Sequence, residues 1–237
     1  MLERFHVPKK DQVKVSEKSI RLLVQQLFQK LGVPKKDAII AADVLITADL
    51  RGVESHGISN MLSKYVEYYQ DGTFNAKPNW KTVSETPNTS VIAADRAHGI
   101  IIGHYAMNSA INKARKHDIG IVNIFNSGHM GPIGHFPMMA AQEDMIGICA
   151  ISAGTGILPT FAAEPRLGTN PIAFAAPGEK EAPFLFDAAT SAIANNKIVL
   201  AIRMGASLLP GWIGDLDGTP IMEEIKVDHP KKHPQLL

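Results

Sequence analysis

The hydrophobic pattern of the chain changes its period near residue 80, and this change limits the folds that the chain can adopt. Before that point, apolar residues recur at every third or fourth position, the spacing of amphipathic helices. Beyond it, short apolar runs alternate with helix-like segments, which is typical of a sheet covered by helices. The pattern therefore predicts an α/β (α+β) protein with a helical N-terminal part.

Three helices are predicted in the first part. Ser16 is a good N-cap for the first helix and Gly32 is a stop signal for it, while Pro34 stands where a first helical turn tolerates proline. The other two helices are expected over Asp37–Asp49 and Ser59–Gln70.

A polar, proline-bearing stretch at residues 75–90 is the predicted domain boundary, with domains at 1–78 and 79–237. The second domain is expected to contain five strands, at Ser90–Ala94, Ile119–Phe125, Met145–Ile151, Pro171–Ala176 and Phe184–Asp187. Its helices are expected at Ile100–Lys116, 134–143 and Ala192–Met204. Residues 208–237 are rich in turn formers, so no packed element is expected at their end.

Charge and cysteine usage narrow the class of protein. The formal net charge of +1 gives no long-range attraction to nucleic acid or to an anionic membrane. No apolar run approaches the ~18 residues of a membrane span, and residues 1–12 lack the apolar core of a targeting signal. Cys149 is the only cysteine, which fits a reducing compartment. We therefore expect a cytoplasmic protein without a nucleic-acid or membrane partner.

The segment Ser55-His56-Gly57 is the first candidate for chemistry. A histidine between two helices can reach a cleft, and its ordinary pKa lets it exchange a proton near neutral pH. Gly57 would permit a close backbone approach. The alternative is that these polar residues only cap the following helix.

A glycine-rich loop with His129 and His135 is the second candidate. It follows an expected strand, and loops of this kind often carry binding groups. Alternatively, its glycines serve only the turn and His135 packs on a helix. Two histidines six residues apart, without a cysteine partner, are a weak metal signal, so no metal is expected.

The third candidate combines Gly168-Thr169-Asn170 with the turn Asp187–Ser191. Small residues at a helix N-terminus leave backbone N–H groups for an anion, and Asp187 could accept ribose hydroxyls. The alternative is an ordinary N-cap of the next helix. Neither a phosphate-binding P-loop nor a complete Rossmann fingerprint occurs in the chain.

Taken in order, the motifs RGVESHG, NSGHMGPIG, PRLGTNPIAF and FDAATS resemble the malate/L-lactate dehydrogenase type-2 family, over residues 15–225. The resemblance implies a non-Rossmann fold, with a central mixed sheet and a helical domain, and an NAD(P)-dependent oxidoreductase. The expected substrate is a small 2-hydroxy or 2-oxo acid. The expected assembly is a homodimer.

The resemblance also assigns residues. Ser55, His56 and His129 are the expected catalytic residues. Cofactor contacts are expected at Ser152, Asn170, Asp187, Ala188, Ala189, Thr190 and Ser191. Reduction of an oxo acid needs a proton at the carbonyl oxygen, and we assign its delivery to His56, with His129 positioning the substrate or sharing that duty.

Two departures from the family pattern affect substrate and activity. Asn60 stands where many relatives carry an arginine that can clamp a carboxylate. Substrate contacts are expected at Arg51, Asn60 and Lys64: either Lys64 or Arg51 replaces the lost charge, or the substrate presents its carboxylate elsewhere. Family members also continue beyond this C-terminus with a glycine- and lysine-bearing segment. From this we expect weak cofactor binding and low activity of this chain alone. The main alternative is a non-catalytic fragment that keeps the fold and the dimer contacts. A further alternative is a metal hydrolase that uses His129 and His135.

Overall fold

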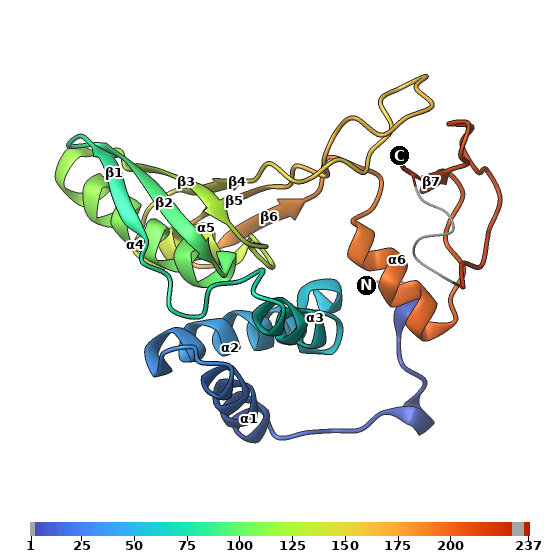
Figure 1. Ribbon diagram of the computed structural model, residues 1–237, viewed down its shortest axis with the longest axis horizontal. Helices are drawn as coiled ribbons and strands as arrows, with labels where there is room; N and C mark the ends of the chain where they lie inside the picture. Colours follow the sequence, from blue (N-terminus) through green and yellow to red (C-terminus); the bar gives the residue numbers. More distant parts are fainter. Residues whose placement is uncertain (1–2, 229–234) are drawn as a thin grey trace. The chain divides into compact units, whose positions relative to one another are not determined.

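A computed structural model describes residues 3–228 and 235–237 of the 237-residue chain. The chain divides into two compact units, which we treat separately (Figure 1). Unit 1 consists of Met1–Lys14, Ala150–Ala173 and Asp187–Leu237, and unit 2 of Val15–Cys149 and Phe174–Phe186. The division predicted between residues 78 and 79 stays a prediction.

Three helices form the helical part of unit 2: α1 (Glu17–Lys30), α2 (Lys35–Leu50) and α3 (Ile58–Gln70), with a short 3-10 turn, η3 (Glu54–His56), before α3. Ser16 caps α1, as its spacing predicts, by accepting the N–H of Ser19. Figure 1 shows α1 and α2 lying side by side. Their apolar faces build a core around the fully buried Phe28, Leu45 and Tyr65.

The first sheet of unit 2 has the order β1-β2-β3. Its strands are β1 (Lys81–Glu85), β2 (Thr89–Ala97) and β3 (Ile121–Ser127). β1 is antiparallel to β2, whereas β2 and β3 are parallel and connected by α4 (Gly99–His117), which packs against both (Figure 1). β1 lies within the polar stretch that we expected to be a linker. Its five residues are all exposed, so they lack the alternation that reveals a strand.

A second sheet has the order β4-β5-β6, formed by β4 (Gly147–Ala150), β5 (Ile172–Ala176) and β6 (Phe184–Ala188). The short helix α5 (His135–Ala141) precedes β4. All five predicted strands are present, with shifted ends. The mixed α/β fold class is therefore confirmed, although the strands are divided among small sheets.

Unit 1 has its own apolar core, in which the helix α6 (Asn195–Met204) contributes Ile198 and Leu200. Two short turns, η1 (Glu3–Phe5) and η2 (Lys9–Asp11), lie near the start of the chain, and Phe5 is buried in this core. The strands β7 (Ile213–Gly214) and β8 (Gln235–Leu236) pair antiparallel.

The expectation that the C-terminal segment lacks a packed element is wrong for its described part. Leu236 pairs with Ile213 and is 3% exposed. Residues 229–234 of that segment lie outside the described residues. A strand of two residues is too short to give a sequence pattern, which explains the error.

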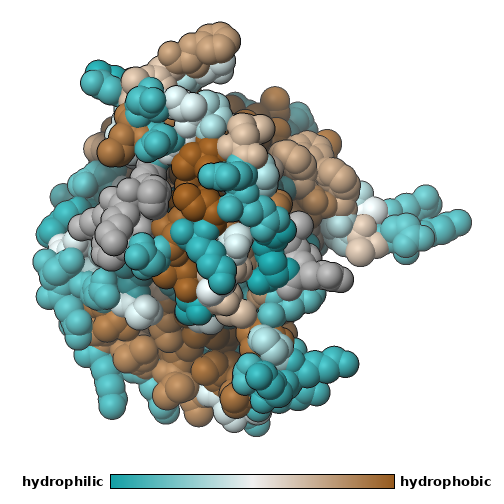
Figure 2. Space-filling view, turned by 90° about the vertical axis from the view of Figure 1, so that its right-hand side faces the viewer, coloured by the Kyte–Doolittle hydropathy of each residue, from teal (hydrophilic) through white to brown (hydrophobic). Residues whose placement is uncertain are grey.

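Many large apolar side chains remain exposed, among them Ile148, Phe184 and Phe186. On the face shown in Figure 2, apolar residues gather between hydrophilic ones. Within the part of the chain that the structure describes, no helix is both long and apolar enough to cross a membrane.

Candidate active site

The carboxyl ends of β2 and β3 lie at one edge of their sheet, because the strands are parallel and Ala97 pairs with Ser127. The chain leaves β2 into His98 and leaves β3 toward His129. The N–H of Gly128 donates to the carbonyl of Ala97 at 2.8 Å and joins the two loops. The crevice outside such strand ends is a common ligand site in α/β proteins.

The turn that carries His56 is held by Asp49 rather than by the polar residues next to the histidine. Asp49 Oδ2 accepts the N–H of Ile58 at 2.8 Å, which satisfies a free donor at the start of α3. The alternative in which Ser55 and His56 cap this helix is therefore wrong. A Cβ at Gly57 would lie 1.7 Å from Asp49 Oδ1, so the expected close approach at this glycine is confirmed.

His56 and His129 lie face to face. Their ring centroids are 5.7 Å apart and their planes are inclined by 11°. Ser55 Oγ lies 2.9 Å from His56 Nδ1 and orients that ring. The structure thus brings together the three residues predicted to be catalytic, and their catalytic roles stay predictions.

A layer of tyrosines on α3 supports the histidines. Tyr65 Oη lies 2.7 Å from His129 Nδ1, and Tyr69 Oη lies 3.1 Å from His98 Nδ1. Tyr65 and His98 are fully or almost fully buried, with ring centroids 4.3 Å apart. His98 Nε2 is buried and has no hydrogen-bond partner among the described residues.

Burial controls the charge of this layer. The atoms packed around its ring lower the pKa of His129 to about 4, because desolvation disfavours the charged imidazolium, although the residue as a whole is exposed. The pKa of His98 is lowered well below its usual value, first by burial and then by the nearby His129. Burial raises the pKa of Tyr65 far above its usual value, so its phenol stays protonated at neutral pH.

The three residues predicted to bind substrate have different surroundings. Asn60 is buried on α3, and its Nδ2 donates to the carbonyl of Ser55 at 3.0 Å. Lys64 is exposed and pairs with Glu67 at 3.3 Å. Arg51 is exposed at the end of α2. Asn60 is thus directly linked to the segment that carries His56, whereas Lys64 binds a neighbour on its own helix.

His135 lies at the start of α5, and its ring contacts differ from those of His56 and His129. Its ring packs on His104, with centroids 6.1 Å apart, and burial lowers its pKa to about 4. Among the residues that the structure describes, no three histidine, cysteine, aspartate or glutamate side chains gather in a way that could hold a metal ion.

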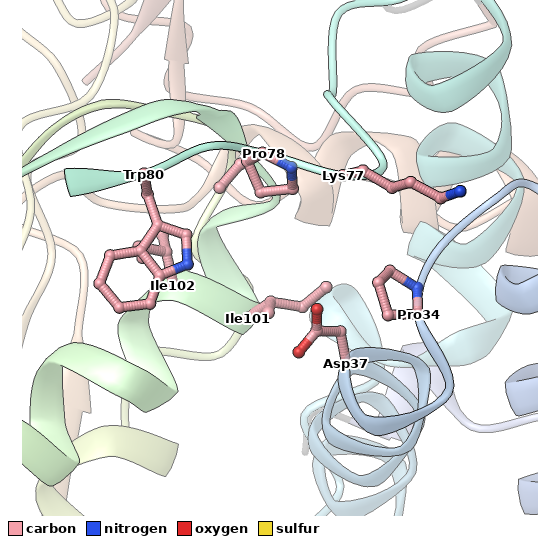
Figure 3. A pocket seen from close by; sticks show the side chains of 8 residues that line it. Pro34, Asp37, Lys77, Pro78, Trp80, Ile101 and Ile102 are labelled. Carbon is pink, nitrogen blue, oxygen red and sulfur yellow. The ribbon is translucent and has the colours of Figure 1, made fainter.

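A cavity of about 260 Å³ opens elsewhere in unit 2 (Figure 3). Trp80 stacks there on Tyr105, whose hydroxyl donates to Asp37 Oδ1 at 2.7 Å. The lining residues are Pro34, Asp37, Lys77, Pro78, Trp80, Ala97, Ile101 and Ile102. The sequence predicts none of them to be functional.

The residues predicted to bind the cofactor lie in unit 1, or where β6 enters it. Thr190 donates to the carbonyl of Thr169 through both its N–H, at 2.9 Å, and its hydroxyl, at 3.1 Å. Asn170 Oδ1 accepts the N–H of Ala153 at 2.9 Å. These bonds hold the segments around Ser152, Asn170 and Thr190 together in one surface. Ser152, Asp187 and Thr190 are exposed, whereas Ala188, Ala189 and Ser191 are half-buried.

The helix after this turn begins later than predicted. α6 starts at Asn195, and its N-cap is Ala194, which has no side-chain oxygen. Ser191 instead donates to the carbonyl of Ile193 at 2.8 Å. The expectation that residues 187–191 lie at the N-terminus or N-cap of this helix is therefore wrong, whereas their role in cofactor binding stays a prediction.

Sequence reasoning missed the support that Tyr65, Tyr69 and His98 give to the site. The two tyrosines are four residues apart on α3 and therefore share one face, which is a readable signal. Their partners are 64 and 29 residues away, and no local pattern connects them.

The chain is similar to known proteins over most of its length. Residues 15–228 match the model of the malate/L-lactate dehydrogenase family. The malate dehydrogenase of Pyrococcus abyssi is 40% identical over 227 residues, which are 95% of this chain and 62% of that protein. The ureidoglycolate dehydrogenase (NAD(+)) of Escherichia coli is 32% identical over 215 residues, 91% of this chain and 61% of that one.

A solved structure is similar over nearly the whole chain. The malate dehydrogenase of Pyrococcus horikoshii superposes on this chain with a TM-score of 0.85 at 36% sequence identity. The matched part is 98% of this chain and 62% of the Pyrococcus horikoshii chain. The chain therefore spans about three fifths of the length of these relatives. The match over residues 15–228 decides the family: this chain belongs to the malate/L-lactate dehydrogenase family.

Proposed function

We propose that the protein is an NAD(P)-dependent oxidoreductase that interconverts a small 2-hydroxy acid and its 2-oxo acid. The observation that carries this proposal is the stacked pair of His56 and His129 at the carboxyl ends of parallel strands. The relatives named malate and ureidoglycolate dehydrogenase support the substrate class.

His56 is the proton donor in this proposal. During reduction, negative charge develops on the carbonyl oxygen, and an imidazolium within hydrogen-bond reach stabilises that charge and delivers the proton. Since His56 Nδ1 lies 2.9 Å from Ser55 Oγ, we assign the proton transfer to the other ring nitrogen, Nε2. In the oxidation direction the same nitrogen accepts the hydroxyl proton.

The chemistry that a nicotinamide cofactor supplies when bound is transfer of a hydride to or from the substrate carbon. The surface around Ser152 and Thr190 fits the polar parts of a dinucleotide, because these two hydroxyl-bearing residues and Asp187 are all exposed. Cβ atoms built at Gly154 and Gly156 meet nothing within 4 Å, so the backbone there is open to a phosphate. Ser152, Asn170 and Asp187–Ser191 would hold the cofactor.

The substrate carboxylate is placed near α3, where Asn60 is anchored to Ser55. Lys64 supplies the positive charge after release from Glu67, with which it forms an exposed ion pair of small energetic weight. Arg51 is the second candidate for this charge.

The proposal includes a homodimer in the cytoplasm. The strands of unit 2 expose five large apolar side chains, those of Ile121, Phe125, Ile148, Phe184 and Phe186. Burial of these side chains against a second copy of the chain would remove their apolar surface from water. Light scattering coupled to size exclusion tests this part, with twice the mass of one chain as the expected result.

The direct test of the function is an absorbance assay of nicotinamide oxidation with a panel of 2-oxo acids and either NADH or NADPH. We expect turnover that depends on both the acid and the cofactor. If neither turnover nor nucleotide binding is found while the chain is folded and dimeric, the alternative of a non-catalytic fragment replaces the proposal.

A further inference from the structure

The environment of His129 Nδ1 decides where this imidazole carries its hydrogen. Two groups approach the nitrogen: the hydroxyl of Tyr65 at 2.7 Å and the backbone N–H of Gly131 at 3.3 Å. A backbone N–H can only donate. Its partner nitrogen must therefore present a lone pair, and Nδ1 carries no hydrogen.

The short contact then has a defined direction. Since Nδ1 is an acceptor, the Tyr65 hydroxyl is the donor in the 2.7 Å hydrogen bond. Tyr65 is fully buried, and its ring packs against both His98 and Phe74, with centroids 4.3 and 5.9 Å away. The phenol therefore cannot turn to another partner without disturbing the core of unit 2.

The Gly131 donor is fixed by its backbone. Gly131 has a φ of +66°, in the left-handed region that favours glycine, and a Cβ there would lie 2.8 Å from Ile100 Cδ1. The loop thus holds this N–H toward Nδ1 in a conformation that a larger residue would strain.

We infer that Tyr65 is a positioning residue that, together with the Gly131 N–H, locks His129 as the neutral tautomer with its hydrogen on Nε2. In this form His129 offers one hydrogen-bond donor and no proton to transfer. The consequence for catalysis rests on the proposed function: His129 donates a hydrogen bond to a substrate oxygen, and delivery of the proton is left to His56. The tautomer itself does not depend on that function.

The test is ¹⁵N NMR of the histidine side chains in the free protein at pH 7, with the His129 signals assigned by their loss in His129→Gln. We expect Nε2 to resonate as a protonated nitrogen and Nδ1 as an unprotonated one. We also expect a resolved Tyr65 hydroxyl proton with an NOE to the ring of His129. A hydrogen on Nδ1, or an imidazolium at this pH, overturns the inference without any need for cofactor or substrate.

Tyr65→Phe removes the hydroxyl and keeps the ring. It should move the two ¹⁵N shifts of His129 toward each other, as the second tautomer becomes populated. Unchanged shifts would show that Tyr65 does not position His129 and would contradict the inference. Tyr69→Phe is the matched control, because it removes the same kind of contact from His98 and should leave the His129 signals unchanged. If Tyr65→Phe does not fold, the wild-type spectrum alone decides the tautomer.

An assay separates this inference from the proposed function. Absence of turnover with an intact Nε2–H tautomer would refute only the function, and turnover with a hydrogen on Nδ1 would refute only the inference.

Discussion

His56 and His129 stack with ring centroids 5.7 Å apart, although 72 residues separate them in the sequence. Two different structural features bring them together. Asp49 fixes the turn of His56 through Ile58, and the parallel pairing of β2 and β3 delivers the loop of His129. Both arrangements depend on specific hydrogen bonds, so both can be tested by substitution.

Gly57→Ala should destabilise the protein by about 1–3 kcal/mol, because the new methyl group would overlap the Asp49 carboxylate and disturb its bond to Ile58. The backbone of Gly57 has a φ of −87°, which alanine adopts without strain, so the effect would be steric. Urea unfolding measures the change. Gly154→Ala is the control, since a Cβ there meets nothing within 4 Å. Equal stability of the two variants would refute the packing described for the turn.

The buried histidines predict that the protein loses stability as the pH falls. His135 has a pKa lowered from 6.5 to about 4 by burial. Between these values the unfolded chain binds the proton and the folded chain does not, so the free energy of unfolding decreases as the pH drops from 6.5 toward 4. One such histidine contributes about 1–3 kcal/mol to this loss.

The measurement is the free energy of unfolding in urea at pH 7 and pH 4.5, for the wild type and for His135→Gln. The variant lacks the titrating group, and we expect its stability to fall less between the two pH values. An equal or larger loss in the variant would contradict the lowered pKa.

On the cofactor side, Asp187→Asn should weaken NADH binding about 10-fold, because a neutral amide accepts hydrogen bonds from ribose hydroxyls less strongly than a carboxylate. Asp217→Asn is the matched control: Asp217 is an exposed aspartate of unit 1 whose carboxylate accepts the N–H of Thr219. Titration of nucleotide fluorescence measures both. A loss of the same size in the control would show a general charge effect rather than a contact at Asp187.

Local chemistry explains which elements were predictable. Ser16 and Gly32 bound α1 because capping and stopping signals act within a few residues. β1 was missed because an exposed edge strand needs no apolar residues, and the start of α6 was misplaced because Thr190 bonds Thr169 instead of the helix. Capping signals in a sequence do not reveal such competing partners.

The site was predictable only in part. The glycines around His56 and His129 mark both loops, and a family resemblance supplies their roles. The hydrogen bond between Tyr65 and His129 was not predictable, since the sequence pattern of an amphipathic helix indicates only that Tyr65 is a core residue. Its function depends on a partner that only the tertiary structure provides.

The measurement that tests the account most directly is the turnover number for reduction of a 2-oxo acid by the wild type, His56→Gln and His129→Gln. Loss of the proton donor should lower kcat by about 10²–10⁴-fold in His56→Gln. His129→Gln keeps an N–H donor and should retain more activity, with the main loss in KM. Unchanged turnover in His56→Gln together with abolished turnover in His129→Gln would contradict the assignment of the proton to His56.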